Sequence, residues 1–179
     1  MRHPTCALLD TLEAIQPVRC VDRILLFTPD DARPEIADIG ADVVHFVSQR
    51  GGTLGERLEH GFADLFALGY GAVALVGSDL PTLPASSVDQ GIEALMQRPD
   101  CAVLGPADDG GYCFIGLRRT HPELFRGIPW STADVLDATR AVAASESLPA
   151  RHLRAWAVAR WRTQFIMPLR ARRPAREHH

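Results

Sequence analysis

The sequence predicts an α/β protein with a mixed, mostly parallel sheet of the doubly wound kind, and three observations support this prediction. Apolar runs that look like strands alternate along the chain with segments of helical periodicity. The runs are unbroken rather than alternating, which is typical of strands covered by helices on both faces of a parallel sheet. Finally, the connection between Leu104 and Tyr112 is too short for a parallel crossover. The strand beginning at Tyr112 should therefore run antiparallel to its neighbour in the sheet.

The individual elements follow from periodicity and from residues that end helices or form turns. The predicted helices cover residues 4–15, 30–39, 54–68 and 87–96. The predicted strands cover residues 23–28, 43–47, 72–76, 102–104 and 112–117. The apolar face of the first helix consists of Leu8, Leu9, Leu12 and Ile15. Ser131 and Asp134 have the spacing of a capping box, which predicts a further helix starting there.

Composition excludes several classes of function. All 19 basic residues are arginine, so a P-loop lysine and a Schiff-base lysine are both excluded. Four cysteines lack any C-x-x-C pair, which favours reduced structural thiols over a zinc site. No apolar run is long enough to span a membrane and no signal peptide is recognisable, so we expect a cytoplasmic protein.

Charge divides the chain into two parts. Residues 1–150 hold 11 arginines against 21 acidic residues, whereas residues 151–179 hold eight arginines and one glutamate. We therefore expect one domain over residues 1–150 and a basic tail, rich in arginine and tryptophan, over residues 151–179. Tail residues from Leu153 to Phe165 have roughly helical spacing. An acidic body is a poor nucleic-acid surface, so no specific nucleic-acid partner is predicted.

Two acidic segments follow predicted strands. Asp79 comes after the strand 72–76, and Asp108 and Asp109 come after the strand 102–104. A right-handed strand-helix-strand unit would place both segments at one edge of the sheet, beyond the carboxyl ends of the strands. Carboxylates there suit Mg²⁺ or Mn²⁺, with Asp79 and Asp108 as candidate ligands. The alternative is that both segments are simply turns.

Two further segments are candidates for ligand contacts. The glycine-rich stretch 49–57 leads into a helix N-terminus, where free backbone N–H groups can hold an anion. Its candidate nucleotide-binding residues are Gln49, Gly52, Gly55 and Arg57. Glycine at the start of a helix and arginine on a surface are also common without any ligand. In the second segment, residues 129–134, the Trp130 ring could hold a sugar or an acceptor. The alternative is that this segment only starts a helix.

Several long motifs occur in an order that resembles a known family. These are GSDLPTLP, LGPADDGGYCFIGL and LFRGIPWSTADVL, preceded by LLDTLEA, RILLFTP and GGTLGERLEHGF. They resemble the radical-SAM/selenodomain-associated transferase family, whose members are similar to glycosyltransferases of the GT-A type and to nucleotide-diphosphosugar transferases. The resemblance extends from about Ala7 to Ser147. It implies a Rossmann-like, three-layer α/β/α fold, a nucleotide donor and a divalent metal.

The resemblance also assigns roles to particular residues. Asp79 resembles the metal-binding aspartate of the family's GSD-x-P loop. A substrate-side loop is implied for Asp109, Gly110, Gly111 and Tyr112. The family's WST segment matches Trp130, Ser131 and Thr132. Proteins of this type usually begin with a strand and a basic loop and continue into an acidic segment after the position of Ser147, and neither is recognisable here.

The expected function is a metal-dependent transferase that uses an activated nucleotide donor, most simply a nucleotide-sugar glycosyltransferase acting on a small-molecule acceptor. Asp109 would be the catalytic residue that orients or deprotonates the acceptor hydroxyl. The alternatives are a nucleotidyltransferase that releases pyrophosphate and a non-catalytic binding protein that kept the fold. Because the opening strand and its loop are not found, we expect this chain to bind metal-nucleotide weakly. The oligomeric state is not predicted.

Overall fold

The computed structural model describes residues 4–19, 21–28, 43–78, 80, 82–98, 100–153 and 165–170. The predicted helix 30–39 and Asp79 lie outside these residues. The helices are α1 (Pro4–Ile15), α3 (Leu54–Ala67), α4 (Ala85–Gln97), α5 (Val135–Ser145) and the short 3₁₀ helix η2 (Pro122–Phe125). The strands are β1 (Arg23–Phe27), β2 (Val43–Ser48), β3 (Val73–Gly77), β4 (Ala102–Pro106), β5 (Tyr112–Leu117), β6 (Ala150–His152) and β7 (Phe165–Arg170).

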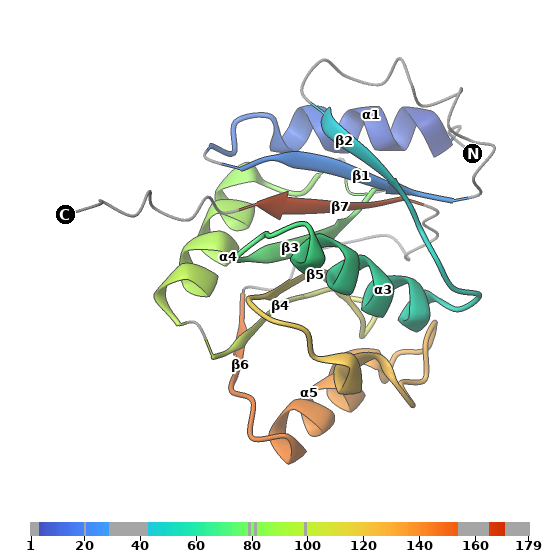
Figure 1. Cartoon of the computed structure of the whole chain (residues 1–179), viewed down its shortest axis with the longest axis vertical. Coiled ribbons are helices and arrows are strands. Elements are labelled where there is room, and N and C mark those ends of the chain that lie inside the picture. Colours follow the sequence, from blue (N-terminus) through green and yellow to red (C-terminus); the bar gives the residue numbers. More distant parts are fainter. Residues whose placement is uncertain are drawn as a thin grey trace.

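These strands form one mixed sheet in the order β2-β1-β7-β3-β5-β4-β6 (Figure 1). The prediction that residues 112–117 run antiparallel is confirmed, because β5 pairs antiparallel with both β3 and β4. Within the described sheet, five strands point one way and β5 and β7 point the other. Since these two lie between the others, only β1–β2 and β4–β6 are parallel pairs. The expectation of a mostly parallel sheet therefore holds for strand direction but is wrong for the pairing.

Buried side chains lie on both faces of the sheet. On β3, Val73 and Leu75 pack in a cluster with Leu58 and Phe62 of α3 and with residues of α5. The intervening β3 residues join a second cluster, which contains Ile15 of α1 and residues of α4. This alternation is the two-residue period of a strand. The unbroken apolar run in the sequence thus reflects burial on both sides, as predicted.

The strand β7 comes from the segment that the charge pattern separates as a tail. It lies between β1 and β3 and is antiparallel to both (Figure 1). Phe165, placed at the end of a helical spacing in the sequence, instead begins this strand. Tail residues 154–164 and 171–179 lie outside the described residues, so what the helical spacing up to Phe165 indicates is not tested there.

Two local predictions are corrected by the structure. On α1, Leu8 and Ile15 are buried, but Leu9 is exposed and Thr11 takes a fully buried position between them. The capping box expected at Ser131 is wrong, because α5 begins only at Val135 and its N-cap residue, Asp134, makes no side-chain cap hydrogen bond. Ser131 has a φ of 67°, a left-handed conformation that cannot begin a helix in this way.

Candidate functional site

Sheet register brings the ends of β3 and β4 to one edge of the sheet. β3 and β4 point the same way on either side of β5, so their carboxyl ends lie at the same edge. Val76 of β3 is opposite Phe114, and Pro106 of β4 is opposite Tyr112, where β5 begins. Continuing the first register by two residues places Ser78 opposite Tyr112 as well. The turn after β3 and the loop after β4 are therefore neighbours across the start of β5.

The loop after β4 is a tight turn held by its own backbone. The N–H of Ala107 donates to the carbonyl of Gly111 (3.0 Å), and the N–H of Gly110 donates to the carbonyl of Ala107 (3.2 Å). One carboxylate oxygen of Asp109, Oδ1, accepts a hydrogen bond from the N–H of Gly111 (3.0 Å). Asp108 is exposed. This bonding fixes the Asp109 side chain and leaves its Oδ2 atom for other contacts.

The segment before α5 packs directly on this turn. The N–H of Leu136 donates to the carbonyl of Gly110 (2.9 Å), so the first turn of α5 is tied to the loop. Gly110 has a φ of 85°, and a Cβ atom there would overlap the carbonyl oxygen of Ala133. The Thr132 hydroxyl donates to the carbonyl of Pro129 (2.8 Å) and accepts from the N–H of Asp134 (3.2 Å). The DGGY turn and the segment that contains WST therefore pack against each other and together make up the motif surface.

Trp130 joins this surface to the N-terminus of α3. Its ring meets the ring of Tyr112 edge-on, with centroids 6.3 Å apart. A Cβ atom on Gly55 would overlap the indole Nε1 atom of Trp130, so only glycine leaves room for the ring. Burial raises the pKa of the Tyr112 phenol well above its usual range, and Thr139 offsets this in part. Tyr112 is thus a neutral, buried support, while Trp130 is half-buried beside the exposed Ser131 and Thr132.

The glycine-rich segment is capped from within the chain. Thr53 is the N-cap of α3 and forms a capping box with Glu56. The Glu56 carboxylate accepts from the N–H groups of Gly52 (2.7 Å) and Thr53 (3.0 Å), and these bonds hold the pKa of Glu56 below its usual range. Two N–H groups of the segment expected to hold an anion, those of Gly52 and Thr53, are therefore already bonded to a carboxylate. Sequence reasoning missed this box, although T-x-x-E at residues 53–56 was its signal.

Gln49 and Arg57, the other candidates in this segment, both bond to backbone carbonyls of the protein. The backbone N–H of Gln49 donates to the carbonyl of Phe27 (2.7 Å) and its Nε2 atom donates to the carbonyl of Leu26 (3.3 Å), which ties the end of β2 to β1. Arg57 donates from Nε to the carbonyl of Gly51 (3.2 Å). The structure therefore brings Gly55 next to Trp130, while Gln49 and Gly52 take part in structural bonds. A nucleotide contact for these residues stays a prediction.

The oxygen donors at this edge match, in kind, what a divalent cation needs. Asp108 and Asp109 supply carboxylate oxygens, the ligands that Mg²⁺ and Mn²⁺ prefer. Among the described residues, no group of three or more histidine, cysteine, aspartate or glutamate side chains is placed to hold a metal. Asp79, the ligand predicted beside Asp108, lies outside them. The predicted pair of ligands therefore stays a prediction.

Comparison with known proteins then identifies the family. The sequence profile of DUF2064, described as "Uncharacterized protein conserved in bacteria", matches residues 11–132. The chain belongs to the DUF2064 family. The matched residues include Asp108, Gly110 and Trp130. The motif surface therefore lies in the part of the chain that the family profile matches. No curated protein matches this DUF2064 chain. Its association with radical-SAM or selenodomain proteins stays a prediction.

A solved structure supports the fold of this DUF2064 protein. Seven chains of solved structures match it. One of them is a protein of Desulfovibrio desulfuricans G20 named "putative nucleotide-diphospho-sugar transferase". It is 32% identical with a TM-score of 0.75, and the match covers 86% of this chain and 67% of that chain. The DUF2064 chain therefore has the mixed α/β fold of a protein named as a nucleotide-sugar transferase.

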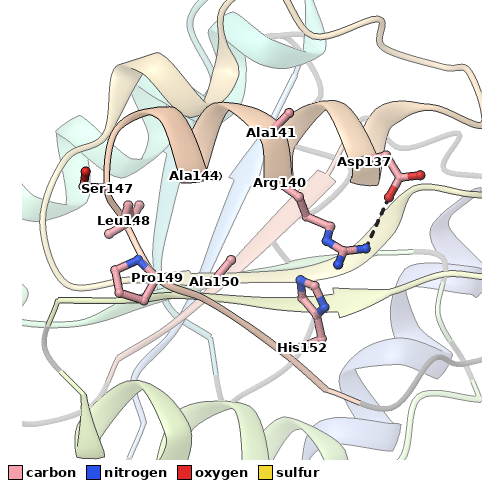
Figure 2. A pocket seen from close by; sticks show the side chains of 9 residues that line it. All are labelled: Asp137, Arg140, Ala141, Ala144, Ser147, Leu148, Pro149, Ala150 and His152. Atoms are coloured by element: carbon pink, nitrogen blue, oxygen red, sulfur yellow. Dashed lines mark hydrogen bonds and ion pairs between the residues drawn. The ribbon is translucent and has the colours of Figure 1, made fainter.

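A separate hollow in this DUF2064 protein lies between α5 and β6 (Figure 2). Arg140 and His152 extend toward each other across it, and Arg140 also pairs with Asp137 (3.3 Å). Burial and, next, the Arg140 charge lower the pKa of His152. None of the residues that line it belongs to the predicted site. The remaining lining residues are Ala141, Ala144, Ser147, Leu148, Pro149 and Ala150.

In the part of the chain that is described, no helix is long and apolar enough to cross a membrane.

Proposed function

We propose that this DUF2064 protein is a divalent-metal-dependent transferase that takes a glycosyl group from a nucleotide-sugar donor and passes it to a small-molecule acceptor. The observation that supports this most is the convergence of three segments at one sheet edge: the turn after β3, the Asp108–Gly111 turn and the segment around Trp130. The ends of strands in α/β sheets are where such folds bind ligands. The likeness to a protein named as a nucleotide-diphospho-sugar transferase adds support.

In this proposal, Asp109 is the base that takes the proton of the acceptor hydroxyl. Its Oδ1 atom accepts from the N–H of Gly111, so the carboxylate is held in place and Oδ2 is available to take the proton of an acceptor hydroxyl. The acceptor oxygen forms a bond to the anomeric carbon while the bond from that carbon to the β-phosphate oxygen breaks. The nucleoside diphosphate leaves with the electron pair. Trp130 offers an aromatic wall for the sugar or the acceptor.

Asp79 and Asp108 would hold the divalent cation, and Asp108 is exposed enough to reach a ligand. When bound, the cation would offset the negative charge of the diphosphate leaving group. No lysine exists in the chain to do this. Arginine is the remaining cationic side chain, and Arg57 belongs to the glycine-rich segment, where its Nε already bonds to Gly51.

The experiment is a binding and product assay with the full chain. Nucleotide sugars with Mn²⁺, at 100 times Kd, should stabilise the protein by about 2.7 kcal/mol, which is roughly 5–10 °C in Tm. Asp79→Asn should weaken Mn²⁺ binding in calorimetry, whereas Asp89→Asn, an exposed aspartate on α4, should not. Release of nucleoside diphosphate supports the proposal. Release of pyrophosphate would show nucleotidyl transfer instead. Equal Mn²⁺ affinity in both variants would contradict the proposed role of Asp79 as a metal ligand.

A further inference from the structure

β6 is an edge strand of the described sheet. It comes last in the strand order, and its described neighbour is β4, with which it pairs in parallel. Just after β6, the N–H of Leu153 donates to the carbonyl of Leu104 (2.9 Å). Along a strand, the backbone groups of alternate residues point to opposite sides, so this bond fixes the direction of the residues before it. The backbone of Arg151 faces β4, whereas the backbone groups of Ala150 and His152 face away from it.

This edge offers main-chain groups to another strand. Ala150 and His152 each present an N–H and a C=O outward, and no described residue bonds to these groups. An extended peptide can add to such an edge by main-chain hydrogen bonds. Short length and charged side chains limit unwanted pairing at sheet edges. β6 has three residues and carries Arg151, so a partner has to match its charge as well as its backbone.

Both faces of the sheet are hollowed beside this edge. Ala150 and His152 line the hollow next to α5 (Figure 2), and Arg151 lines a second hollow next to α4. The volumes of the two hollows are about 710 Å³ and about 350 Å³. Side chains of an added strand alternate between the same two faces. The hollows therefore provide space for them on both sides of the sheet.

Charge at this edge indicates which peptide fits. In the hollow next to α5, Arg140 pairs with Asp137 (3.3 Å). In the hollow next to α4, Glu93 accepts a hydrogen bond from Gln97 (3.0 Å), while Arg151 forms no ion pair with any described residue. Opposite charges on directly opposed residues of two strands stabilise the pairing, and like charges destabilise it. The position opposite Arg151 therefore favours aspartate or glutamate.

Other occupants match this edge less well. Two copies of β6 related by a two-fold axis would run antiparallel, and full overlap would place two Arg151 side chains directly opposite each other. That arrangement of like charges is destabilising. A nucleic acid carries the charge that suits Arg151, but it has no peptide backbone to pair with Ala150 and His152. An acidic peptide meets both requirements.

We propose that β6 binds an extended acidic peptide segment of another protein, which joins the sheet as a further strand and places an acidic side chain opposite Arg151. The outward backbone groups of Ala150 and His152 supply the main-chain hydrogen bonds. The two hollows receive the alternate side chains of the peptide. None of these residues belongs to the proposed transferase site, so the inference does not depend on that function.

Amide hydrogen exchange in the full chain tests whether the edge is open. The amide of Arg151 faces β4 and should exchange slowly, whereas the amides of Ala150 and His152 should exchange quickly. This contrast between neighbouring residues supports the proposal. Equal rates at the three positions, whether slow or fast, would overturn it, because the edge would then be either already covered or not formed.

NMR titration of the full chain measures peptide binding. The probe is a short blocked peptide with glutamate at its centre, valine on either side and threonine beyond. One comparison peptide has lysine in place of glutamate, and another has methyl groups on the amides of glutamate and both valines. The glutamate peptide should bind at least about threefold more tightly than the lysine peptide and slow exchange at Ala150 and His152. Equal binding of the methylated peptide, or no binding of the glutamate peptide, would overturn strand addition.

Variants of β6 separate the charge from the backbone. Arg151→Glu should reverse the preference in favour of the lysine peptide, because the charge opposite the central residue changes sign. Arg19→Glu makes the same charge change at an exposed residue between α1 and β1, and should keep the preference for glutamate. Ala150→Pro removes an outward N–H, a change that edge strands tolerate, and should weaken binding of both peptides at least about tenfold.

The remaining outcomes also decide the proposal. An unchanged preference in Arg151→Glu would overturn the role of its charge. A dimer seen by sedimentation of the chain alone, and abolished by Ala150→Pro, would assign the edge to a second copy and overturn the peptide as its occupant. If Ala150→Pro does not fold, Arg151→Glu and the methylated peptide still decide between binding by strand addition and binding by charge alone.

Discussion

Gly110 lies against the segment before α5, and Gly110→Ala tests that contact. Gly110 has a φ of 85°, where an L-residue with a side chain costs about 1–2 kcal/mol. The added methyl group would also overlap the carbonyl oxygen of Ala133, and overpacking of this kind costs about 1–3 kcal/mol. We therefore expect Gly110→Ala to lower the free energy of unfolding by about 2–5 kcal/mol, since the two effects act on the same residue.

Gly127→Ala is the matched control. Gly127 also has a positive φ, 70°, but nothing lies within 4 Å of the position of its Cβ atom. This variant should lose only the backbone part, about 1–2 kcal/mol. Urea unfolding measures both, and hydrogen exchange at the amide of Leu136, which bonds to Gly110, reports whether the contact itself loosens. Equal losses of stability in the two variants would refute the idea that Gly110 locks these segments together.

Three more predictions concern titratable groups and a cap. The pKa of Glu56 is lower in the folded chain than in the unfolded chain, so ionised Glu56 stabilises the fold above its unfolded-state pKa. This stabilisation is lost as pH falls through the folded-state pKa. The difference in Tm between the unchanged chain and Glu56→Gln should therefore be larger near neutral pH than in strong acid. Arg140→Ala should raise the pKa of His152, measured by proton NMR, because the arginine is one of the causes that lower it. Burial raises the pKa of Cys113 to about 12, so this thiol should stay unmodified by a disulfide reagent in mildly alkaline buffer in the folded chain and react after unfolding.

Local patterns predicted much of the fold. The helical stripe of α3 and the apolar runs of β1, β3 and β5 predicted elements whose ends agree with the structure within a few residues. The antiparallel direction of β5 also followed, because chain length limits how far a connection can reach. By contrast, Phe165 was placed in a helical spacing, although it begins a central strand. This strand forms because it pairs with β1 and β3, which are far from it in sequence. The spacing of apolar residues within the segment does not indicate such partners.

The candidate site was predictable to a smaller degree. Asp108 and the turn at Ser78 reach one edge of the sheet because strand direction alone places them there. The contact of Gly110 with Ala133 and the insertion of Trp130 against Gly55 were not predicted, since both depend on how loops pack on each other. Ser131 looked like an N-cap because of its residue type and spacing, yet its backbone is left-handed.

The position of β7 has a consequence for the order in which the molecule assembles. β7 is the last described strand along the chain but lies inside the sheet, and the described β1 and β3 are joined through it. Pro168, opposite Leu75, has no N–H to donate to a neighbouring strand. Contacts between residues far apart in sequence form slowly. The β2–β1 pair and the β3–β5–β4–β6 group can therefore join into the described sheet only after residues 165–170 have been made.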